Sequence, residues 1–248
     1  MSLKINNKEP KNWRELQLFV NEILDECGYL TQIEKTIQTL RGKVEIDVYA
    51  EKDEGIKTII LCECKFWKNN IPQTVVHSLK SVVNDFGATN GFIISKVGFQ
   101  SGAKEAVDKS NITLLTWSDF QELFLSKWLE NIIERNHKIG RELLPFTTGL
   151  GFFYDLYEKL DQEKQKDINY VIESYSRFEI FSQKDLYFDL NENRISIKNI
   201  NEIISELKSK LPIRIESYQD YFNFIYKYCD EALTKIDLIT GERIRKTY

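Results

Sequence analysis

Gly42-Lys-Val-Glu-Ile-Asp-Val-Tyr-Ala50 and Ile59-Ile-Leu-Cys-Glu-Cys-Lys-Phe-Trp67 are two apolar runs, rich in β-branched residues, with a charged turn between them. This pattern predicts two neighbouring strands. Because side chains alternate along a strand, Glu63 and Lys65 should share one face of the second strand. Asp47 lies on the first strand, so the two strands together carry two carboxylates and one lysine. Such charged side chains are costly to bury unless they pair with each other or bind a cation. This cost indicates a functional site.

The same alternation predicts that Glu45, Asp47 and Tyr49 share one face of the first strand. A cross-strand cluster of ion pairs on an exposed sheet face would also explain Asp47, Glu63 and Lys65. Strand cysteines flank Glu63 on both sides, at positions 62 and 64. We expect Cys62 and Cys64 to be buried rather than zinc ligands, because no further Cys or His lies at a suitable spacing.

The composition is that of an ordinary globular protein, with 248 residues, 42% hydrophobic and 29% charged. The net charge of −4 argues against general polyanion binding by bulk charge, so any nucleic-acid contact must come from a local basic patch. No run approaches the roughly 18 uncharged residues that span a bilayer. The four cysteines have no framework spacing, and we expect a cytoplasmic protein with no membrane association.

Hydrophobic periodicity and turn residues divide the N-terminal half into helices and strands. We expect helices at residues 12–26, 72–86, 102–109 and 118–134, and strands at residues 29–40, 44–50, 57–66, 92–94 and 112–115. The strand–helix–strand units require parallel pairing, whereas the first three strands form a meander. The fold class is therefore α/β, with a mixed β-sheet flanked by helices on both faces.

The pattern changes near residue 136. Residues 137–175 are expected to be mostly helical, Asp185 to Lys198 to form a hairpin, and residues 199–210 and 218–235 to form helices. We predict a catalytic domain at residues 1–135. Residues 136–248 would form an α+β or mainly helical accessory domain for recognition, dimerisation or regulation.

The order Asp47…Glu63-x-Lys65 suits hydrolysis of a phosphodiester, which needs charge stabilisation at the phosphate and an activated water. Mg²⁺ takes one or two carboxylates together with waters and substrate oxygens, so Asp47 and Glu63 suffice as its protein ligands. Lys65 would lie beside the reacting water or stabilise developing charge. His77 is expected to be a partly exposed helix residue. The lysines Lys68, Lys80, Lys96 and Lys104 could contact a DNA backbone or simply be solvated.

These two strands resemble the signature of the PD-(D/E)xK nucleases. The wider pattern is similar to the Mrr-like restriction endonuclease family over about residues 12–125, on the strength of Gly28-Tyr29, the loop from Ser95 to Ala103, and Ile112 to Asp119. The resemblance implies a Mg²⁺-dependent DNA endonuclease, with Mn²⁺ able to substitute, acting in restriction or defence against foreign DNA. It also implies a homodimer that cuts both strands. By the same resemblance, Ser95 either binds phosphate or caps the helix that follows.

One position departs from the family. Where the family usually has a glutamate on the first helix, this sequence has Gln17. The nearby Glu15 and Glu22 lie away from the apolar side of the helix predicted at residues 12–26. A site with one metal ion is therefore expected. Two other functions stay open: a branched-DNA resolvase or repair nuclease, and a nucleic-acid-binding sensor module with weak catalysis.

Overall fold

The computed structural model describes residues 3–148, 152–189, 192 and 194–243. The chain divides into two compact units. The nuclease-like unit spans Asn7–Trp128, and the second unit takes in the N-terminal segment up to Asn6 and the chain from Leu129 onward. The division falls within helix α4 (Trp117–Thr148), which the sequence predicted to end near residue 134. The helix continues because its apolar side chains remain buried, as at Leu143 and Phe146.

The unit Asn7–Trp128 contains a five-stranded sheet with the strands in chain order. Its members are β1 (Leu30–Thr39), β2 (Gly42–Asp53), β3 (Lys57–Lys65), β4 (Asn90–Ser95) and β5 (Ile112–Thr116). The first three strands pair antiparallel and the last three pair parallel. The predicted mixed sheet is confirmed.

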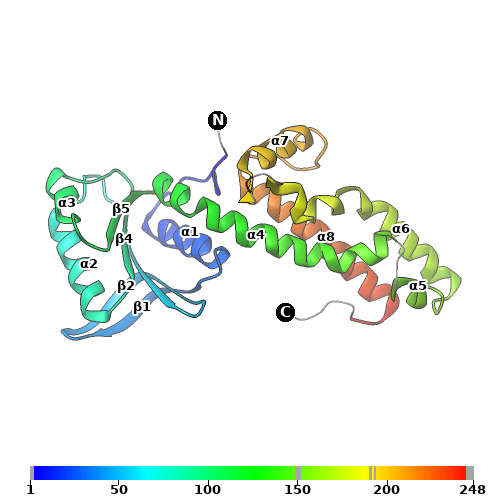
Figure 1. Ribbon diagram of the computed structural model, residues 1–248, viewed down its shortest axis with the longest axis horizontal. Coiled ribbons are helices and arrows are strands. Elements are labelled where there is room, and N and C mark those ends of the chain that lie inside the picture. The colour runs from blue at the N-terminus through cyan, green and yellow to red at the C-terminus, as the bar shows by residue number, and fades with distance from the viewer. Residues whose placement is uncertain (1–2, 149–151, 190–191, 193, 244–248) are drawn as a thin grey trace. The chain divides into compact units, whose positions relative to one another are not determined.

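Helices cover both faces of this sheet, with α1 (Trp13–Glu26) on one side and α2 (Gln73–Phe86) on the other (Figure 1). α3 (Ser101–Ala106) packs beside α2. The side-chain oxygen of Asn12 accepts a hydrogen bond from the backbone N–H of Glu15 at 2.9 Å, which caps α1. α1 therefore begins at a defined residue and holds its apolar stripe against the sheet.

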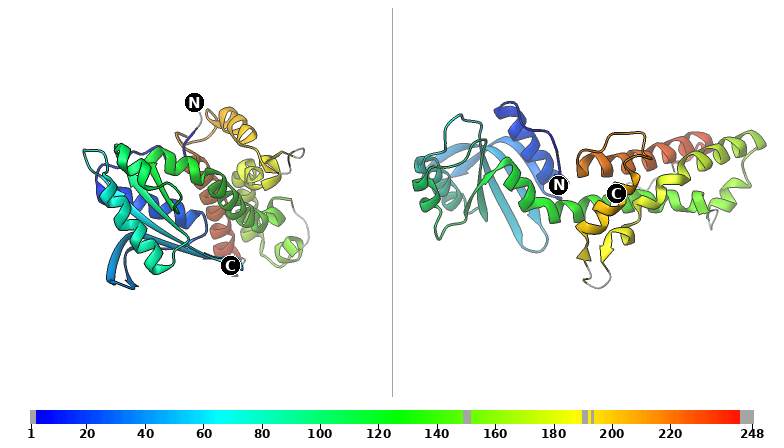
Figure 2. Two further views of the ribbon diagram at one scale, coloured as in Figure 1. Left: turned by 60° about the vertical axis from the view of Figure 1, so that its left-hand side comes forward. Right: turned by 90° about the horizontal axis from the view of Figure 1, so that it is seen from above.

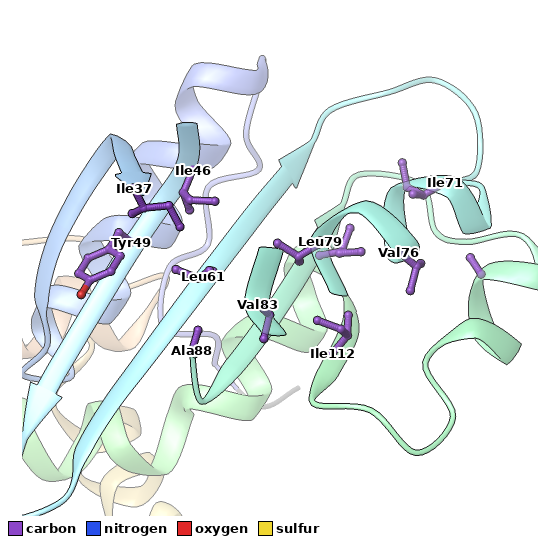
Figure 3. Packing of buried hydrophobic residues seen from close by; sticks show 12 residues of the cluster. Ile37, Ile46, Tyr49, Leu61, Ile71, Val76, Leu79, Val83, Ala88 and Ile112 are labelled. Carbon is purple, nitrogen blue, oxygen red and sulfur yellow. The ribbon is translucent and has the colours of Figure 1, made fainter. Parts of the chain in front are cut away.

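The core beneath α2 is built from β-sheet and helix side chains that interdigitate (Figure 3). Close packing extends to Gly91 in β4, where an added Cβ would lie 2.6 Å from Ile112 Cδ1 and 2.8 Å from Val83 Cγ2. Such distances leave no room for a side chain. Gly91 thus lets α2 approach the centre of the sheet.

β2 does not alternate regularly. Ile46 and Tyr49 pack in the same cluster beneath α2, although strict alternation would place them on opposite faces. The irregularity coincides with Glu34 on β1, which has a φ of 52°, and with a gap in the register between Ile33↔Val48 and Lys35↔Ile46. The prediction that Glu45, Asp47 and Tyr49 share one face depended on strict alternation, which β2 does not keep between Ile46 and Tyr49.

The second unit is mainly helical. Besides the later part of α4 it contains α5 (Phe152–Tyr157), α6 (Gln162–Glu179), α7 (Ile197–Leu207) and α8 (Tyr218–Thr240). α6 and α8 pack along each other (Figure 2). One apolar cluster takes side chains from α4, α5, α6 and α8. The mainly helical alternative for this half is therefore confirmed.

The predicted hairpin at residues 185–198 is reduced to the two-residue strands β6 (Phe188–Asp189) and β7 (Arg194–Ile195). Leu190, Asn191 and Asn193, at its turn, lie outside the described residues. Before β6 the chain forms 3-10 turns, because Tyr187 is fully buried and its hydroxyl donates to the carbonyl of Phe181. Tertiary burial of this tyrosine overrides the strand pattern.

The N-terminal segment joins the second unit through backbone hydrogen bonds. The carbonyls of Lys4 and Ile5 accept from the N–H groups of Tyr218 and Gln219, both at 3.0 Å. Ile5 is completely buried. In the described ranges, no helix has the length and apolar character needed to cross a membrane.

Candidate active site

Asp47 lies on β2 where the pairing with β3 ends. The last paired residues are Val48 and Cys62, and beyond them the carboxylate of Asp47 replaces the backbone as partner. Its Oδ2 accepts from the backbone N–H of Cys64 at 2.7 Å, and its Oδ1 accepts from Nε2 of Gln17 at 2.9 Å. Both oxygens of Asp47 are therefore held in place, one by β3 and one by α1.

Glu63 and Lys65 contact each other as an ion pair between Oε1 and Nζ on β3. Both side chains are largely buried, with 23% of Glu63 and 21% of Lys65 exposed. Burial, and then the negative charge of Asp47, raises the pKa of Glu63, while Lys65 opposes this shift. The structure thus brings the three residues of the motif together at the end of the β2–β3 ladder.

The donor atoms here suit a hard cation. A carboxylate offers about four lone-pair positions, and the hydrogen bonds from Gln17 and Cys64 use one on each oxygen of Asp47. The charge of Asp47 acts directly on Glu63, so a divalent cation between them would relieve the repulsion. Among the described residues, no group of three or more His, Cys, Asp or Glu side chains is arranged for a metal. Mg²⁺ usually takes only one or two carboxylate ligands from a protein, so two carboxylates suffice.

A groove with a volume of about 360 Å³ opens beside Glu63 and Lys65. Side chains from β2, β3 and α2 line it, among them Ile46, Leu79 and Ser78. Trp67 also lines the groove, with 44% of the residue exposed, and Nζ of Lys65 lies 5.6 Å from the centre of its ring. An aromatic surface therefore adjoins the charged cluster.

Gln17 reaches the site from α1 and is only 3% exposed. Its Oε1 accepts from Nη1 of Arg14 at 3.3 Å, and the same nitrogen forms an ion pair with Oε1 of Glu34 at 2.6 Å. Neither Glu15 nor Glu22 takes this position. Glu15 instead accepts from the backbone N–H of Lys11 at 2.9 Å near the start of the helix.

The candidate basic residues do not all gather here. Lys96 follows β4, its backbone N–H donates to the carbonyl of Lys65, and its Nζ lies 4.2 Å from the centre of the Phe66 ring. Lys104 lines a different pocket, between α3 and β5. His77 is exposed on α2, as predicted, and Lys68 is exposed after β3. The pairing of β3 with β4 thus places Lys96 directly beside Lys65 at the end of the two strands.

Ser95 has neither predicted role. It is completely buried, its hydroxyl donates to the carbonyl of Gly98 and accepts from the N–H groups of Val97 and Gly98. The hydroxyl shapes the turn after β4, and Gln100 precedes α3 without a side-chain cap. Cys62 and Cys64 are buried free thiols, as expected, and burial raises the pKa of both.

Three residues beside the site were missed in the sequence: Arg14, Glu34 and Trp67. Arg14 precedes Gln17 by three positions, a spacing that places two helical side chains next to each other. That spacing was a usable signal. The contact of Arg14 with Glu34 joins residues 20 apart in the chain and had no local signal.

Comparison with known proteins relates the first half of the chain to one protein family. The family model Mrr_cat, described as restriction endonuclease, matches residues 10–124. No curated protein matches. A crystal structure of a protein of unknown function, AF1548, is similar at 22% identity, covering 80% of this chain and 98% of that chain, with a TM-score of 0.39. Residues 10–124, which carry the sheet and the acidic cluster, are therefore consistent with a Mrr-like PD-(D/E)xK nuclease segment, and this match supports a nuclease of the restriction endonuclease superfamily.

Proposed function

We propose that the protein is a metal-dependent DNA endonuclease whose catalytic residues are Asp47, Glu63 and Lys65. The observation that carries the proposal is the clamped carboxylate of Asp47 beside the buried Glu63–Lys65 pair. An exposed cluster of surface ion pairs would not be buried to this degree, nor would it need both oxygens of one carboxylate to be fixed. Burial of these charges is costly without a function that uses them.

Asp47 and Glu63 would hold Mg²⁺, and restriction-endonuclease-like proteins generally use divalent metals. When bound, the ion would stabilise charge on the phosphate and lower the pKa of the attacking water; Mn²⁺ would substitute for it. Gln17 and the N–H of Cys64 hold Asp47 in one orientation. Lys65 would donate to a phosphate oxygen as negative charge develops.

DNA would reach the cluster along the edge formed by the ends of β3 and β4, where Lys65 and Lys96 lie. Restriction or defence against foreign DNA is the biological setting that we propose. The second unit would supply recognition, dimerisation or regulation, and a homodimer would place two sites on opposite strands.

The test is plasmid cleavage by the purified protein with Mg²⁺, with Mn²⁺ and with a chelator. We expect Asp47→Ala and Lys65→Ala to abolish cleavage, whereas Arg41→Ala, which breaks the ion pair with Asp85 between the β1–β2 turn and α2, should cleave normally. Metal-dependent cleavage that survives both site substitutions would contradict the assignment. Protein that binds DNA but never cleaves it would indicate the sensor alternative.

The groove favours one further substrate. Trp67 offers an exposed ring beside the cluster, and stacking on such a ring suits bases that have left the duplex. A branched-DNA resolvase or repair nuclease is therefore the second candidate. Parallel cleavage of linear, methylated and four-way DNA by the wild-type protein separates it from restriction.

A further inference from the structure

A chain of polar contacts links Asp47 to a residue on the neighbouring strand through α1. Gln17 donates to Asp47, Arg14 donates to Gln17, and Arg14 also pairs with Glu34. Gln17 is the buried member, and its carboxamide is engaged at both ends. Arg14 donates in both directions, to Glu34 and to Gln17, and Gln17 donates onward to Asp47.

The orientation of the Gln17 amide follows from its neighbours. A guanidinium only donates hydrogen bonds, so the amide oxygen must face Arg14. An ionised carboxylate only accepts, so the amide nitrogen must face Asp47. A reversed amide would lose both contacts. Arg14 and Asp47 therefore favour the same orientation of the Gln17 amide.

Arg14 is in turn anchored by Glu34, on β1. Glu34 has a φ of 52°, a left-handed conformation that non-glycine residues adopt infrequently. The register between β1 and β2 skips the pair that Glu34 and Asp47 would form. The ion pair from Arg14 to Glu34, at 2.6 Å, thus ties α1 to β1 beside the position where Asp47 leaves the regular strand.

We propose that Arg14, Gln17 and Glu34 are positioning residues that fix the carboxylate of Asp47 for one divalent cation. This inference rests on the proposed function of Asp47 and Glu63 as metal ligands. Gln17 adds no negative charge, and the charge of Glu34 is balanced by Arg14. Two carboxylates, Asp47 and Glu63, then remain to face a single ion.

Calorimetric titration with Ca²⁺ tests the chain without any cleavage. Loss of a hydrogen-bonding partner of a ligand typically lowers metal affinity about 10–100-fold. We expect Arg14→Ala and Gln17→Ala each to weaken Ca²⁺ binding by at least about tenfold in this range, and Arg14→Lys to retain part of the affinity. The double variant Arg14→Ala/Gln17→Ala should be no weaker than Gln17→Ala alone, because both act through one hydrogen bond.

Arg41→Ala is the matched control, since it removes another surface arginine that pairs with a carboxylate in the same unit. It should bind Ca²⁺ like the wild type. Unchanged affinity in Arg14→Ala, additive losses in the double variant, or two ions bound per wild-type chain would each overturn the proposal. If Asp47→Ala abolishes binding while Arg14→Ala has no effect, the positioning chain fails and the proposed metal site stands.

A second measurement works on the metal-free protein. The backbone amide of Cys64 donates to Asp47, so its proton resonance reports how the carboxylate is held. We expect this resonance to move upfield in Arg14→Ala and in Gln17→Ala, but not in Arg41→Ala, while circular dichroism stays unchanged. An unmoved Cys64 resonance in Arg14→Ala contradicts the proposal even if the wild type binds no ion.

Discussion

The N–H of Cys64 donates to Oδ2 of Asp47 at 2.7 Å, just beyond the last paired residues of β2 and β3. A backbone donor that would otherwise need a strand partner is satisfied by a side chain. The strands can therefore separate at this point without leaving the amide unpaired. The candidate site occupies the place where the ladder opens.

Asp47→Asn should destabilise the protein. Two donors, from Gln17 and Cys64, point at Asp47, but an asparagine offers a single acceptor oxygen. An unpaired buried donor costs about 1–3 kcal/mol, so we expect the free energy of unfolding to fall by about that amount. Urea denaturation measures it, with Asp53→Asn on the same strand as the exposed control. An equal change in both variants would contradict the clamped geometry.

Lys96→Ala should weaken DNA binding without changing the chemical step. A lysine on phosphate contributes about one unit to the slope of log affinity against log salt, so that slope should decrease by about one. Fluorescence anisotropy across a salt series gives the slope. Lys104→Ala, in the pocket between α3 and β5, is the control and should leave it unchanged. Equal effects of the two lysines would indicate only a general loss of charge.

Trp67→Ala should raise KM for branched or frayed DNA and leave kcat little changed. Stacking of a base on an aromatic side chain contributes about 1–3 kcal/mol, which corresponds to a five- to about 150-fold loss of affinity. Trp67→Phe keeps an aromatic face and should retain most of the binding. Steady-state kinetics on paired and unpaired substrates provides the measurement. If the phenylalanine variant is as weak as the alanine variant, stacking is not the cause.

Gly91→Ala should destabilise the nuclease-like unit, because the new methyl group would meet Ile112 and Val83. Overpacking of a core typically costs about 1–3 kcal/mol, which thermal or urea unfolding would register. Gly102→Ala provides the control. Its added Cβ would lie 3.0 Å from Oε1 of Gln73, the movable end of a flexible side chain, and should have little effect.

Glu179→Gln should stabilise the second unit at neutral pH. Burial raises the pKa of Glu179 above its ordinary value of 4.5, although hydrogen bonds from Gln183 and Thr147 oppose the shift. The folded state then holds the proton more tightly than the unfolded state, so stability falls as pH rises through the raised pKa. The gain from glutamine should be largest at pH 7 and shrink toward pH 4. Unfolding curves at the two pH values would show a constant gain if charge burial were not the cause.

The sequence predicts the parts of the site that depend on local periodicity. Glu63 and Lys65 lie two residues apart on one strand, so their contact follows from the alternation of side chains. The missing pair between Glu34 and Asp47 could not be predicted this way, since it coincides with the left-handed backbone of Glu34 on another strand. The contact of Gln17 with Asp47 spans 30 residues and depends on how α1 packs on the sheet.

In the second unit, too, the features that depend on local periodicity could be predicted, whereas those that depend on long-range contacts could not. Helices α7 and α8 follow from their apolar periodicity and lie close to their predicted ranges, and most of α6 lies within residues 137–175, which were predicted to be mostly helical. The predicted hairpin is shortened to two residues in each strand, and Tyr187 just before it finds partners in Phe181 and Tyr221, contacts that no local pattern reveals. Where a buried polar group hydrogen-bonds to residues far away in the chain, tertiary packing determines the backbone conformation more than the local sequence pattern does.

The pairing of Lys4 and Ile5 with Tyr218 and Gln219 affects the order in which parts of the chain can fold during translation. Domains generally fold as units while the ribosome is still extending the chain. The segment Asn7–Trp128 is continuous and can collapse once it has emerged, whereas Ile5 must wait for more than two hundred further residues. The segment up to Asn6 is thus translated before the nuclease-like unit but finds its native partners after it. The nascent nuclease-like unit would exist for a time without the helices of the second unit.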